Sequence, residues 1–250
     1  KVENVHHWTN KLFSFRVSRP SSFRFRSGEF VMLGLLIEGK PLLRAYSVAS
    51  PFWDDGLDFY SIKVEDGPLT SRLQYIGTGD EIVLGKKPTG TLVHDCLTPG
   101  ERLFLFSTGT GIAPFASIIR DPETFEKFDQ VIMTHTCRNV ADLQYGVDLV
   151  KNIKDDPLLP SNAPSRVTYY SSTTQENFER MGRITNLMTN GKLFNDLNIK
   201  ELDSKTDRVM ICGSMNMIND TKKIVEQVGF EEGSNAKPGD FVVEKAFAES

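Results

Sequence analysis

The sequence predicts two domains, an N-terminal antiparallel β-barrel over residues 1–98 and a C-terminal α/β domain with a parallel sheet over residues 99–250. The length of 250 residues suffices for two ordinary domains. Short apolar runs separated by turn residues fill the first part, whereas strand-like and helix-like segments alternate in the second. The pattern changes at Pro99-Gly100, where we place the boundary.

In the first domain, apolar residues recur with a period of two, as they do in half-buried strands. The runs are "LFSFRV", "EFVMLGLLI", "RAYSVAS", "LDFYSIKV" and "DEIVLG", with Gly, Pro and Asp-Gly between them. Helical periodicity is nearly absent. We therefore expect short antiparallel strands that close into a small barrel or sandwich.

In the second domain, the strand-like runs are "RLFLFS", "DQVIMTH", "SRVTYYS" and "DRVMICG". Longer segments with helical spacing separate them, such as "VADLQYGVDLVKNI" and "NMINDTKKIVEQVG". Alternation of strand and helix predicts a parallel sheet with helical crossovers.

Composition excludes several classes of protein. The net charge is -4 without a block of Lys or Arg, so nucleic acid is not an expected partner. The longest apolar run, Phe30 to Ile37, is far shorter than the roughly 20 residues of a membrane span. Cys96, Cys137 and Cys212 share no C-x-x-C spacing, which argues against a disulfide framework and a metal site and favours a cytoplasmic location.

Charge is divided unevenly between the two domains. Residues 1–98 hold 12 Lys/Arg against 11 Asp/Glu, and the remainder holds 17 against 22. Six cations of the first domain are candidates for a patch: Arg16, Arg19, Arg24, Arg26, Lys86 and Lys87. They form either a docking surface for an acidic partner or solvated strand faces and loops, and the sequence does not choose between the two.

A glycine turn, Thr108 to Gly111 in "STGTGIAPF", follows a predicted strand and precedes a predicted helix. In an open α/β sheet, ligands bind beyond the carboxyl ends of the strands, where backbone N–H groups meet phosphate. Pro114 fits the first turn of a helix. The spacing matches neither of the common phosphate-binding fingerprints, so a nucleotide diphosphate site and a plain tight turn both remain open.

Two further clusters bear on a nucleotide. Cys212-Gly213-Ser214 forms a second turn between strand and helix, although Cys212 alone also fits a small buried residue. In the first domain, Arg44 and Tyr46 lie on one face of a strand, where a cation binds diphosphate and a ring stacks on a planar cofactor. The turn in "DGPLTSRL" adds hydrogen-bond donors for a second dinucleotide site.

In order and spacing, these motifs resemble those of the bacterial-type ferredoxin/flavodoxin–NADP(H) reductases. The motifs are "RAYS", "SIKV", "GPLTSRL", "STGTGIAPF", "ICGS" and "FVVEKAF", and the resemblance covers essentially the whole chain. It implies non-covalent FAD on the barrel, NADP(H) on the α/β domain, and a crevice in which the two cofactors meet. The implied activity is hydride transfer between NADP(H) and FAD, with single electrons passed to or from ferredoxin or flavodoxin.

The resemblance also implies roles for individual residues. Ser47 matches a serine beside the reactive flavin nitrogen, Cys212 a cysteine beside the nicotinamide, and Glu244 a carboxylate near the flavin that relays protons or tunes its charge. The positions that match FAD contacts are Arg44, Ala45, Tyr46, Ser47, Ser61, Ile62, Lys63, Val64, Leu69, Thr70, Ser71 and Thr110. Those that match NADP(H) contacts are Thr110, Gly111, Ile112, Ala113, Pro114, Gly213 and Ser214.

Selection of NADP(H) requires cations for the 2′-phosphate, and Arg138 and Arg183 match family positions for that role, beside Thr174. Many relatives have Thr-Arg-Glu where this chain has Thr-Gln-Glu, so Gln175 removes one cation. We expect a preference for NADP(H) to remain.

The C-terminus departs from the plastid-type relatives, which end with an aromatic residue stacked on the flavin. Here Ala246 takes that position and residues 247–250 extend beyond it, as in a bacterial subclass. We expect this tail, Ala246 and Phe247 included, to cover the flavin or the FAD adenine. The nicotinamide must then displace a group that covers the flavin before it can react.

Several alternatives remain. One is an NADH-dependent reductase component of an oxygenase, although the C-x4-C-x2-C run of a fused iron–sulfur domain is missing. Others are a non-catalytic electron-transfer subunit and a reductase of free flavin or ferric iron. For the reductase we expect a monomer that docks transiently with an acidic ferredoxin or flavodoxin.

Overall fold

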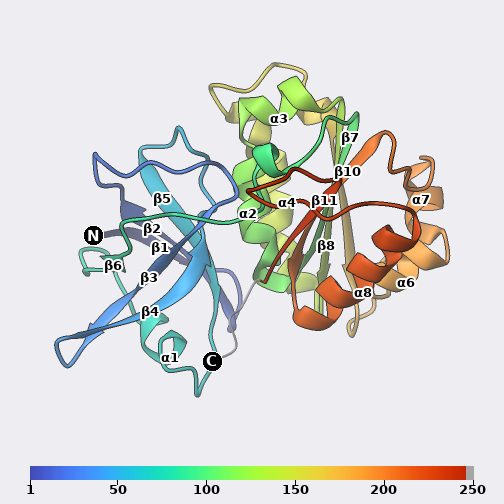
Figure 1. The fold of residues 1–250 in the computed structure, drawn as a ribbon. Helices are drawn as coiled ribbons and strands as arrows, with labels where there is room; N and C mark the ends of the chain where they lie inside the picture. The colour runs from blue at the N-terminus through green and yellow to red at the C-terminus, as the bar shows by residue number, and fades with distance from the viewer. Residues whose placement is uncertain (246–250) are drawn as a thin grey trace.

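The N-terminal half consists of two three-stranded antiparallel sheets, with orders β1-β2-β5 and β4-β3-β6 (Figure 1). The computed structural model describes residues 1–245 of the chain. The strands are β1 (Val2–His7), β2 (Leu12–Ser18), β3 (Phe30–Ile37), β4 (Lys40–Ser47), β5 (Gly56–Ile62) and β6 (Val83–Leu84). Phe13, Phe59 and Leu33 from both sheets meet in one apolar core, which confirms the predicted β-barrel.

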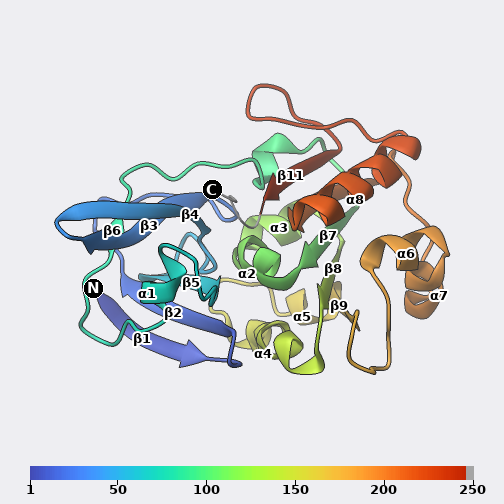
Figure 2. The ribbon, with the colours of Figure 1, turned by 90° about the horizontal axis from the view of Figure 1, so that it is seen from below.

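The C-terminal half is an α/β domain around one parallel sheet. Its strands, in the order β11-β10-β7-β8-β9, are β7 (Arg102–Thr108), β8 (Gln130–Cys137), β9 (Val167–Thr173), β10 (Asp207–Gly213) and β11 (Phe241–Lys245). Helices cover both faces, as Figure 2 shows. On the barrel side lie α2 (Ala113–Ile118), α3 (Pro122–Lys127), α4 (Gln144–Asn152) and α5 (Ala163–Arg166), and on the far side α6 (Ile184–Thr189), α7 (Lys192–Leu197) and α8 (Met215–Gln227). The predicted fold is confirmed.

The order of the strands creates a switch point between β7 and β10. From β7 the chain continues outward to β8 and β9, and then returns to the other side of β7 for β10 and β11. At such a point the connections on the two sides of the sheet diverge, and a crevice opens beyond the carboxyl ends of the two strands. Both predicted glycine turns lie there, after Thr108 and after Cys212.

Some elements differ from the sequence-based expectation. The edge strand β1 was not anticipated, because its mostly exposed residues show little alternation. Only Val83 and Leu84 of "DEIVLG" pair as a strand. The turn expected in "DGPLTSRL" becomes the short helix α1 (Thr70–Leu73). A short 3-10 segment, η1 (His94–Cys96), lies between β6 and β7, and three others adjoin helices: η2 (Gly109–Ile112), η3 (Val140–Leu143) and η4 (Ile153–Asp155).

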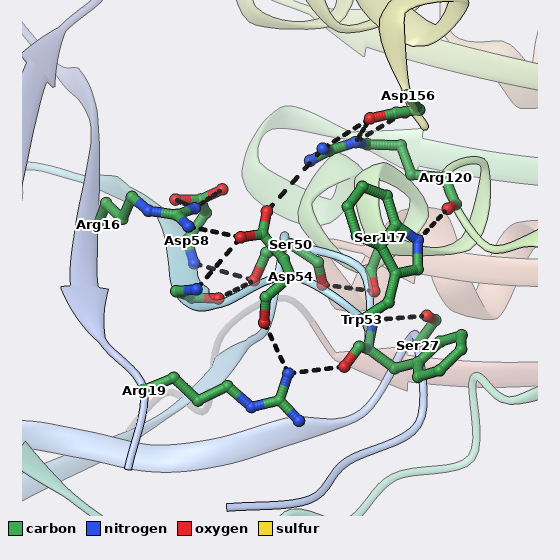
Figure 3. A network of polar contacts seen from close by, with 12 residues as sticks. Arg16, Arg19, Ser27, Ser50, Trp53, Asp54, Asp58, Ser117, Arg120 and Asp156 are labelled. Carbon is green, nitrogen blue, oxygen red and sulfur yellow. Dashed lines mark hydrogen bonds and ion pairs between the residues drawn. The ribbon is translucent and has the colours of Figure 1, made fainter. Parts of the chain in front are cut away.

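A polar network connects the two halves (Figure 3). Arg120, which follows α2, donates to both carboxylate oxygens of Asp156 at 2.8–3.0 Å and lies 3.9 Å from Asp54 of the barrel. The indole Nε1 of Trp53 donates to the Arg120 carbonyl at 2.9 Å, and the Arg120 guanidinium lies over the Trp53 ring. The barrel loop before β5 is thus bonded directly to the α/β domain.

Two further contacts strengthen this interface. The Ser117 hydroxyl donates to the Ser50 carbonyl at 2.8 Å. Tyr60 of β5 stacks on Tyr145 of α4 with ring centroids 4.1 Å apart, and Trp8 meets the edge of Tyr145. Because hydrogen bonds and stacked rings are directional, these contacts hold the two domains in one relative position.

No helix of the described residues 1–245 combines the length and the apolar character that a bilayer crossing needs.

Candidate functional site

The two glycine turns pack directly on one another at the switch point. A Cβ atom at Gly111 would lie 2.3 Å from the Cys212 carbonyl oxygen, and one at Gly213 would lie 2.2 Å from the Thr108 hydroxyl. The Ser214 backbone N–H donates to that hydroxyl at 3.2 Å. At Gly111 the obstructing atoms belong to the backbone, whereas at Gly213 they are the side chains of Thr108 and Met217, so the requirement for glycine is strictest at Gly111.

The turn after β7 presents backbone donors to the crevice. Gly109 has a φ of +54°, in the left-handed region that favours glycine. It opens η2, which runs into α2 with Pro114 in the first turn, as expected. The first N–H groups of a helical segment have no partner within it and carry partial positive charge, so this turn suits an anion such as a diphosphate.

On the barrel side, β4 brings Arg44 and Tyr46 to one face, as predicted from their spacing. The Tyr46 hydroxyl hydrogen-bonds to that of Ser61 on β5 at 3.1 Å. Within residues 1–245, the recorded hydrogen bond of the Arg44 guanidinium goes to the adjacent Leu43 carbonyl, at 2.9 Å, and no carboxylate pairs with it. Its charge is therefore available to a ligand.

The other predicted FAD positions adjoin this pair. β5 ends at Ile62, and Lys63 and Val64 follow it. The Thr70 hydroxyl donates to the Val64 carbonyl at 3.2 Å, so the start of α1 is bound to the end of this segment. Leu69 is buried, whereas Val64 is exposed. The segments 61–64 and 69–71 thus form one wall with β4.

Cys212 and Glu244 are direct neighbours on the sheet. Parallel pairing places Cys212 opposite Glu244 on one side and Ser107 on the other. Cys212 is fully buried, and burial raises its thiol pKa well above the usual value, so the thiol keeps its proton. It is a small neutral group in the interior at this end of the sheet and does not act as a thiolate nucleophile.

Glu244 has the strongest perturbation among the carboxyl groups of the site. Its Oε1 accepts from the Thr91 backbone N–H at 3.4 Å, and its Oε2 is buried without a hydrogen-bond partner in the described chain. Burial raises its pKa to about 8, and the charge of Glu29 contributes in the same direction. This carboxyl oxygen therefore has hydrogen-bonding capacity that the described residues do not use.

Ser47 lies close to Glu244 through the start of β3. Ser47 pairs with Phe30 across the sheet. The neighbouring Gly90 lies so close to both Phe30 and Glu244 that a Cβ there would be 2.9 Å from the Glu244 carboxylate and 3.4 Å from the Phe30 ring. The three residues predicted to border the reacting rings therefore come from β4, β10 and β11 to one region between the domains.

The residues predicted for the 2′-phosphate gather at the carboxyl ends of β8 and β9. Thr174 donates its backbone N–H to the Cys137 carbonyl, and Gln175 donates to that of Arg138. The Gly182 N–H, just before Arg183, donates to the Thr173 carbonyl at 2.8 Å. Arg138 and Arg183 are exposed. The backbone thus places two exposed arginines, Arg138 and Arg183, near the exposed residues Thr174 and Gln175.

The six-cation patch of the barrel is largely occupied by internal contacts. Arg16 pairs with Glu3, Asp54 and Asp58, and Arg26 pairs with Glu29 and Asp95. The remaining four cations lack a carboxylate partner in the described part of the chain. Arg19 and Arg24 donate to backbone carbonyls, whereas Lys86 and Lys87 are exposed. Internal contacts thus involve four of the six cations, and the other two, Lys86 and Lys87, are exposed.

One cluster has the composition of a metal site. His94, Asp121 and Glu123 offer ligand atoms within 4.8 Å of one another. Each has another role, because Asp121 accepts from the first turn of α3, His94 bonds to Thr124, and Glu123 pairs with Lys127. These contacts account for the cluster without an ion.

One predicted part of the site lies outside the residues that the structure describes, and one part of the structure was not predicted from the sequence. Ala246 and Phe247, with the tail expected to cover the flavin, are outside the described residues. Conversely, sequence analysis did not single out His135, which bonds to the Gly109 carbonyl from β8 at 2.9 Å. In "DQVIMTHTC" it resembles any other buried strand position, and no signal in the sequence distinguishes it.

Comparison with known proteins finds one family match in each half of the chain. A family described as the oxidoreductase FAD-binding domain matches residues 1–94. A family described as the oxidoreductase NAD-binding domain matches residues 105–223.

Similar proteins extend over the whole chain. A flavodoxin/ferredoxin–NADP reductase of Rhodobacter capsulatus is 57% identical over 98% of this chain and 92% of its own length. A ferredoxin–NADP reductase of Pseudomonas aeruginosa is 46% identical over 100% and 97%. Among solved structures, a ferredoxin NADP+ reductase of Neisseria gonorrhoeae with bound FAD and NADP has a TM-score of 0.88 and 31% identity, and covers 98% of this chain and 97% of its own.

Proposed function

Because this chain belongs to the bacterial ferredoxin/flavodoxin–NADP reductases, we propose that the crevice between β4 and the two glycine turns is its catalytic site. The enzyme transfers a hydride between NADP(H) and FAD and passes electrons to or from ferredoxin or flavodoxin. When bound, FAD supplies the exchange between a two-electron hydride and single electrons. The single observation that carries the placement is the contact of Gly111 with Cys212 at the switch point of the sheet.

The residues of the barrel wall fit FAD. Arg44 offers a planar fork of donors without a carboxylate partner in the described chain, as a diphosphate requires. Tyr46, anchored by Ser61, offers a ring to a planar group. We assign FAD to Arg44, Ala45, Tyr46 and Ser47, with 61–64 and 69–71, and NADP(H) to 110–114, Gly213 and Ser214.

We assign the chemical roles around the reacting rings by position. Ser47 offers a hydroxyl that orients the flavin and nicotinamide rings. Cys212, whose thiol is neutral, lies beside the nicotinamide. Glu244 holds or releases a proton near neutral pH, since its pKa is about 8. Alignment of two rings is the main task of the protein, because positioning alone lowers the barrier of a bimolecular transfer by several kcal/mol.

The pH dependence of stability tests the state of Glu244. In the folded protein this carboxyl has a pKa of about 8, above its unfolded value, so it is protonated when folded and ionised when unfolded between these values. The resulting stability is present below the unfolded pKa and is lost as pH rises through 8. We expect Glu244→Gln, which imitates the protonated acid, to be more stable than the parent by on the order of 2 kcal/mol at pH 9 and equal at pH 4.

Denaturant unfolding of the FAD-free protein from pH 4 to pH 9 measures this difference. Glu231→Gln is the matched control, because the side chain of Glu231 is 78% exposed. A constant difference between Glu244→Gln and the parent across the whole range would contradict the assignment.

Discrimination between the two nicotinamide nucleotides tests the proposed 2′-phosphate site. Arg138→Ala and Arg183→Ala each remove an exposed cation from the ends of β8 and β9. We expect each change to raise KM for NADPH about tenfold and to leave kcat unchanged, because it removes one charged hydrogen bond away from the reacting rings. KM for NADH should stay within twofold.

Steady-state kinetics with NADPH and with NADH measures these KM and kcat values. Arg166→Ala serves as the control, since Arg166 bonds to carbonyls at the opposite end of β8. Equal losses with NADPH and NADH would contradict the site and would favour an NADH-dependent reductase, to which Gln175 also points.

We further propose the finer organisation that the sequence suggests. The FAD domain spans residues 1–98 and the NADP(H) domain residues 99–250, and the enzyme is a cytoplasmic monomer that docks transiently with an acidic carrier. The three cysteines, all free and buried, are consistent with a reducing compartment. Exposed Lys86 and Lys87 support an acidic partner, and gel filtration tests the monomer.

A further inference from the structure

His135 is a fully buried histidine that the roles above leave unused. It lies on β8, where its neighbours in register are Ser107 of β7 and Ser171 of β9. Its ring reaches to the glycine turn after β7: Nε2 lies 2.9 Å from the Gly109 carbonyl oxygen. Nδ1 lies 3.0 Å from the Tyr169 hydroxyl on β9.

These two bonds determine where the proton of the imidazole is. A carbonyl oxygen only accepts, so Nε2 carries the hydrogen and donates it to Gly109. In the neutral ring Nδ1 then accepts, and the Tyr169 hydroxyl is the donor. Burial lowers the pKa of His135 to about 4 and raises that of Tyr169, which keeps both groups neutral at physiological pH.

Tyr169 is itself held in place from the other side. Gly146 of α4 packs against it so tightly that a Cβ there would lie 2.3 Å from the Tyr169 hydroxyl. The Leu143 carbonyl lies 3.5 Å from the same hydroxyl. Cys137 adds a second neighbour to the imidazole, with Sγ 3.2 Å from Nε2. The ring thus has fixed contacts at both nitrogens.

The bond to Gly109 matters because a peptide unit is planar. The Gly109 carbonyl and the Thr110 N–H belong to one plane and point in opposite directions. With the carbonyl held toward His135, the Thr110 N–H is held on the side away from the imidazole. The backbone bonds of η2 restrain this peptide only through the short 3-10 segment, and glycine tolerates both signs of φ, so a side-chain bond to the Gly109 carbonyl adds to the restraint against turning the peptide over. Among residues 1–245, no side chain caps the turn at Thr108, and His135 supplies the restraint.

We propose that His135 is a positioning residue for NADP(H): it fixes the Gly109–Thr110 peptide so that the turn offers N–H donors to the nucleotide diphosphate, and Tyr169 fixes the tautomer that makes this possible. The proposal rests on the proposed placement of NADP(H) at this turn. It predicts that changes at His135 weaken contacts to the diphosphate and leave those to the 2′-phosphate intact.

Two ligands separate these contacts in the FAD-bound enzyme. NADP+ contains both groups, whereas adenosine 2′-monophosphate has the 2′-phosphate and no diphosphate. In isothermal titration calorimetry, we expect His135→Leu to raise Kd for NADP+ about tenfold and to leave Kd for adenosine 2′-monophosphate within twofold. His135→Gln, which retains an N–H donor of similar reach, should recover most of the NADP+ affinity.

Wild-type NADP+ affinity in His135→Leu, or equal losses for both ligands, would overturn the proposal. If His135→Leu does not fold, Tyr169→Phe provides the test, because it removes only the donor to Nδ1. Kd for NADP+ should then rise at least threefold while Kd for adenosine 2′-monophosphate stays within twofold of the parent value, and an unchanged Kd for NADP+ would equally refute the role of His135. If the parent enzyme binds neither ligand, the proposed function itself fails, which is a distinct outcome.

Discussion

Replacing Gly111 by alanine is expected to abolish most NADP(H) binding while FAD stays bound. The new Cβ would lie 2.3 Å from the Cys212 carbonyl oxygen and 3.0 Å from the Gly213 Cα. Both are backbone atoms, so one of the two glycine turns must move, at a cost of about 1–3 kcal/mol. Because we propose that the same turns hold the nucleotide, we expect Kd for NADP+ to rise about 10- to 100-fold.

Titration of the FAD-bound enzyme with NADP+ measures this effect, and two other glycines provide controls. At Gly77 no atom lies within 4 Å of an added Cβ, so Gly77→Ala should bind NADP+ normally. An added Cβ at Gly109 would also meet no atom, but Gly109 has a φ of +54°. Gly109→Ala therefore isolates the effect of backbone strain, which costs about 1–2 kcal/mol. Normal NADP+ affinity in Gly111→Ala would show that the two turns do not bind the nucleotide.

Replacing Arg44 by alanine is expected to release FAD. Each hydrogen bond between a guanidinium and a phosphate contributes about 1.5–3 kcal/mol, so the loss of one bidentate contact should raise Kd for FAD at least 100-fold. The recorded hydrogen bond of this guanidinium within the described chain is to the adjacent Leu43 carbonyl, so the FAD-free protein should unfold at nearly the same denaturant concentration as the parent.

The fluorescence of released FAD on dilution gives this Kd directly. Arg44→Lys keeps the positive charge and loses the planar fork, so an intermediate affinity is expected. If Arg44→Ala retains FAD as tightly as the parent, the flavin diphosphate is held elsewhere and the assignment of β4 is wrong.

Local signals in the sequence predict much of this site. Thr108 to Gly111 and Cys212 to Ser214 each combine a buried strand, a glycine and the start of a helix within a few residues, and the structure contains both turns. The alternation of Arg44 and Tyr46 likewise predicts one shared face, and Tyr46 bonds to Ser61 from the next strand. Short-range patterns of this kind reflect backbone geometry, which is why they transfer directly to structure.

The remaining features depend on how distant segments meet. That Gly111 touches Cys212 follows from the pairing of β7 with β10, which no periodicity reveals. The bond from His135 to Gly109 depends on side-chain reach between neighbouring strands. Arg16 and Arg26 appeared as candidates for a docking patch because their carboxylate partners include Asp58 and Asp95, far away in the sequence.

The central claim is that NADPH delivers a hydride to FAD bound between these domains. Anaerobic stopped-flow mixing of the FAD-bound enzyme with NADPH or NADH, followed through the bleaching of the flavin absorption band, tests it most directly. We predict rapid bleaching by NADPH and much slower bleaching by NADH, since Arg138 and Arg183 are expected to hold the 2′-phosphate. A protein that binds no flavin, or whose flavin NADPH does not bleach, would contradict the account.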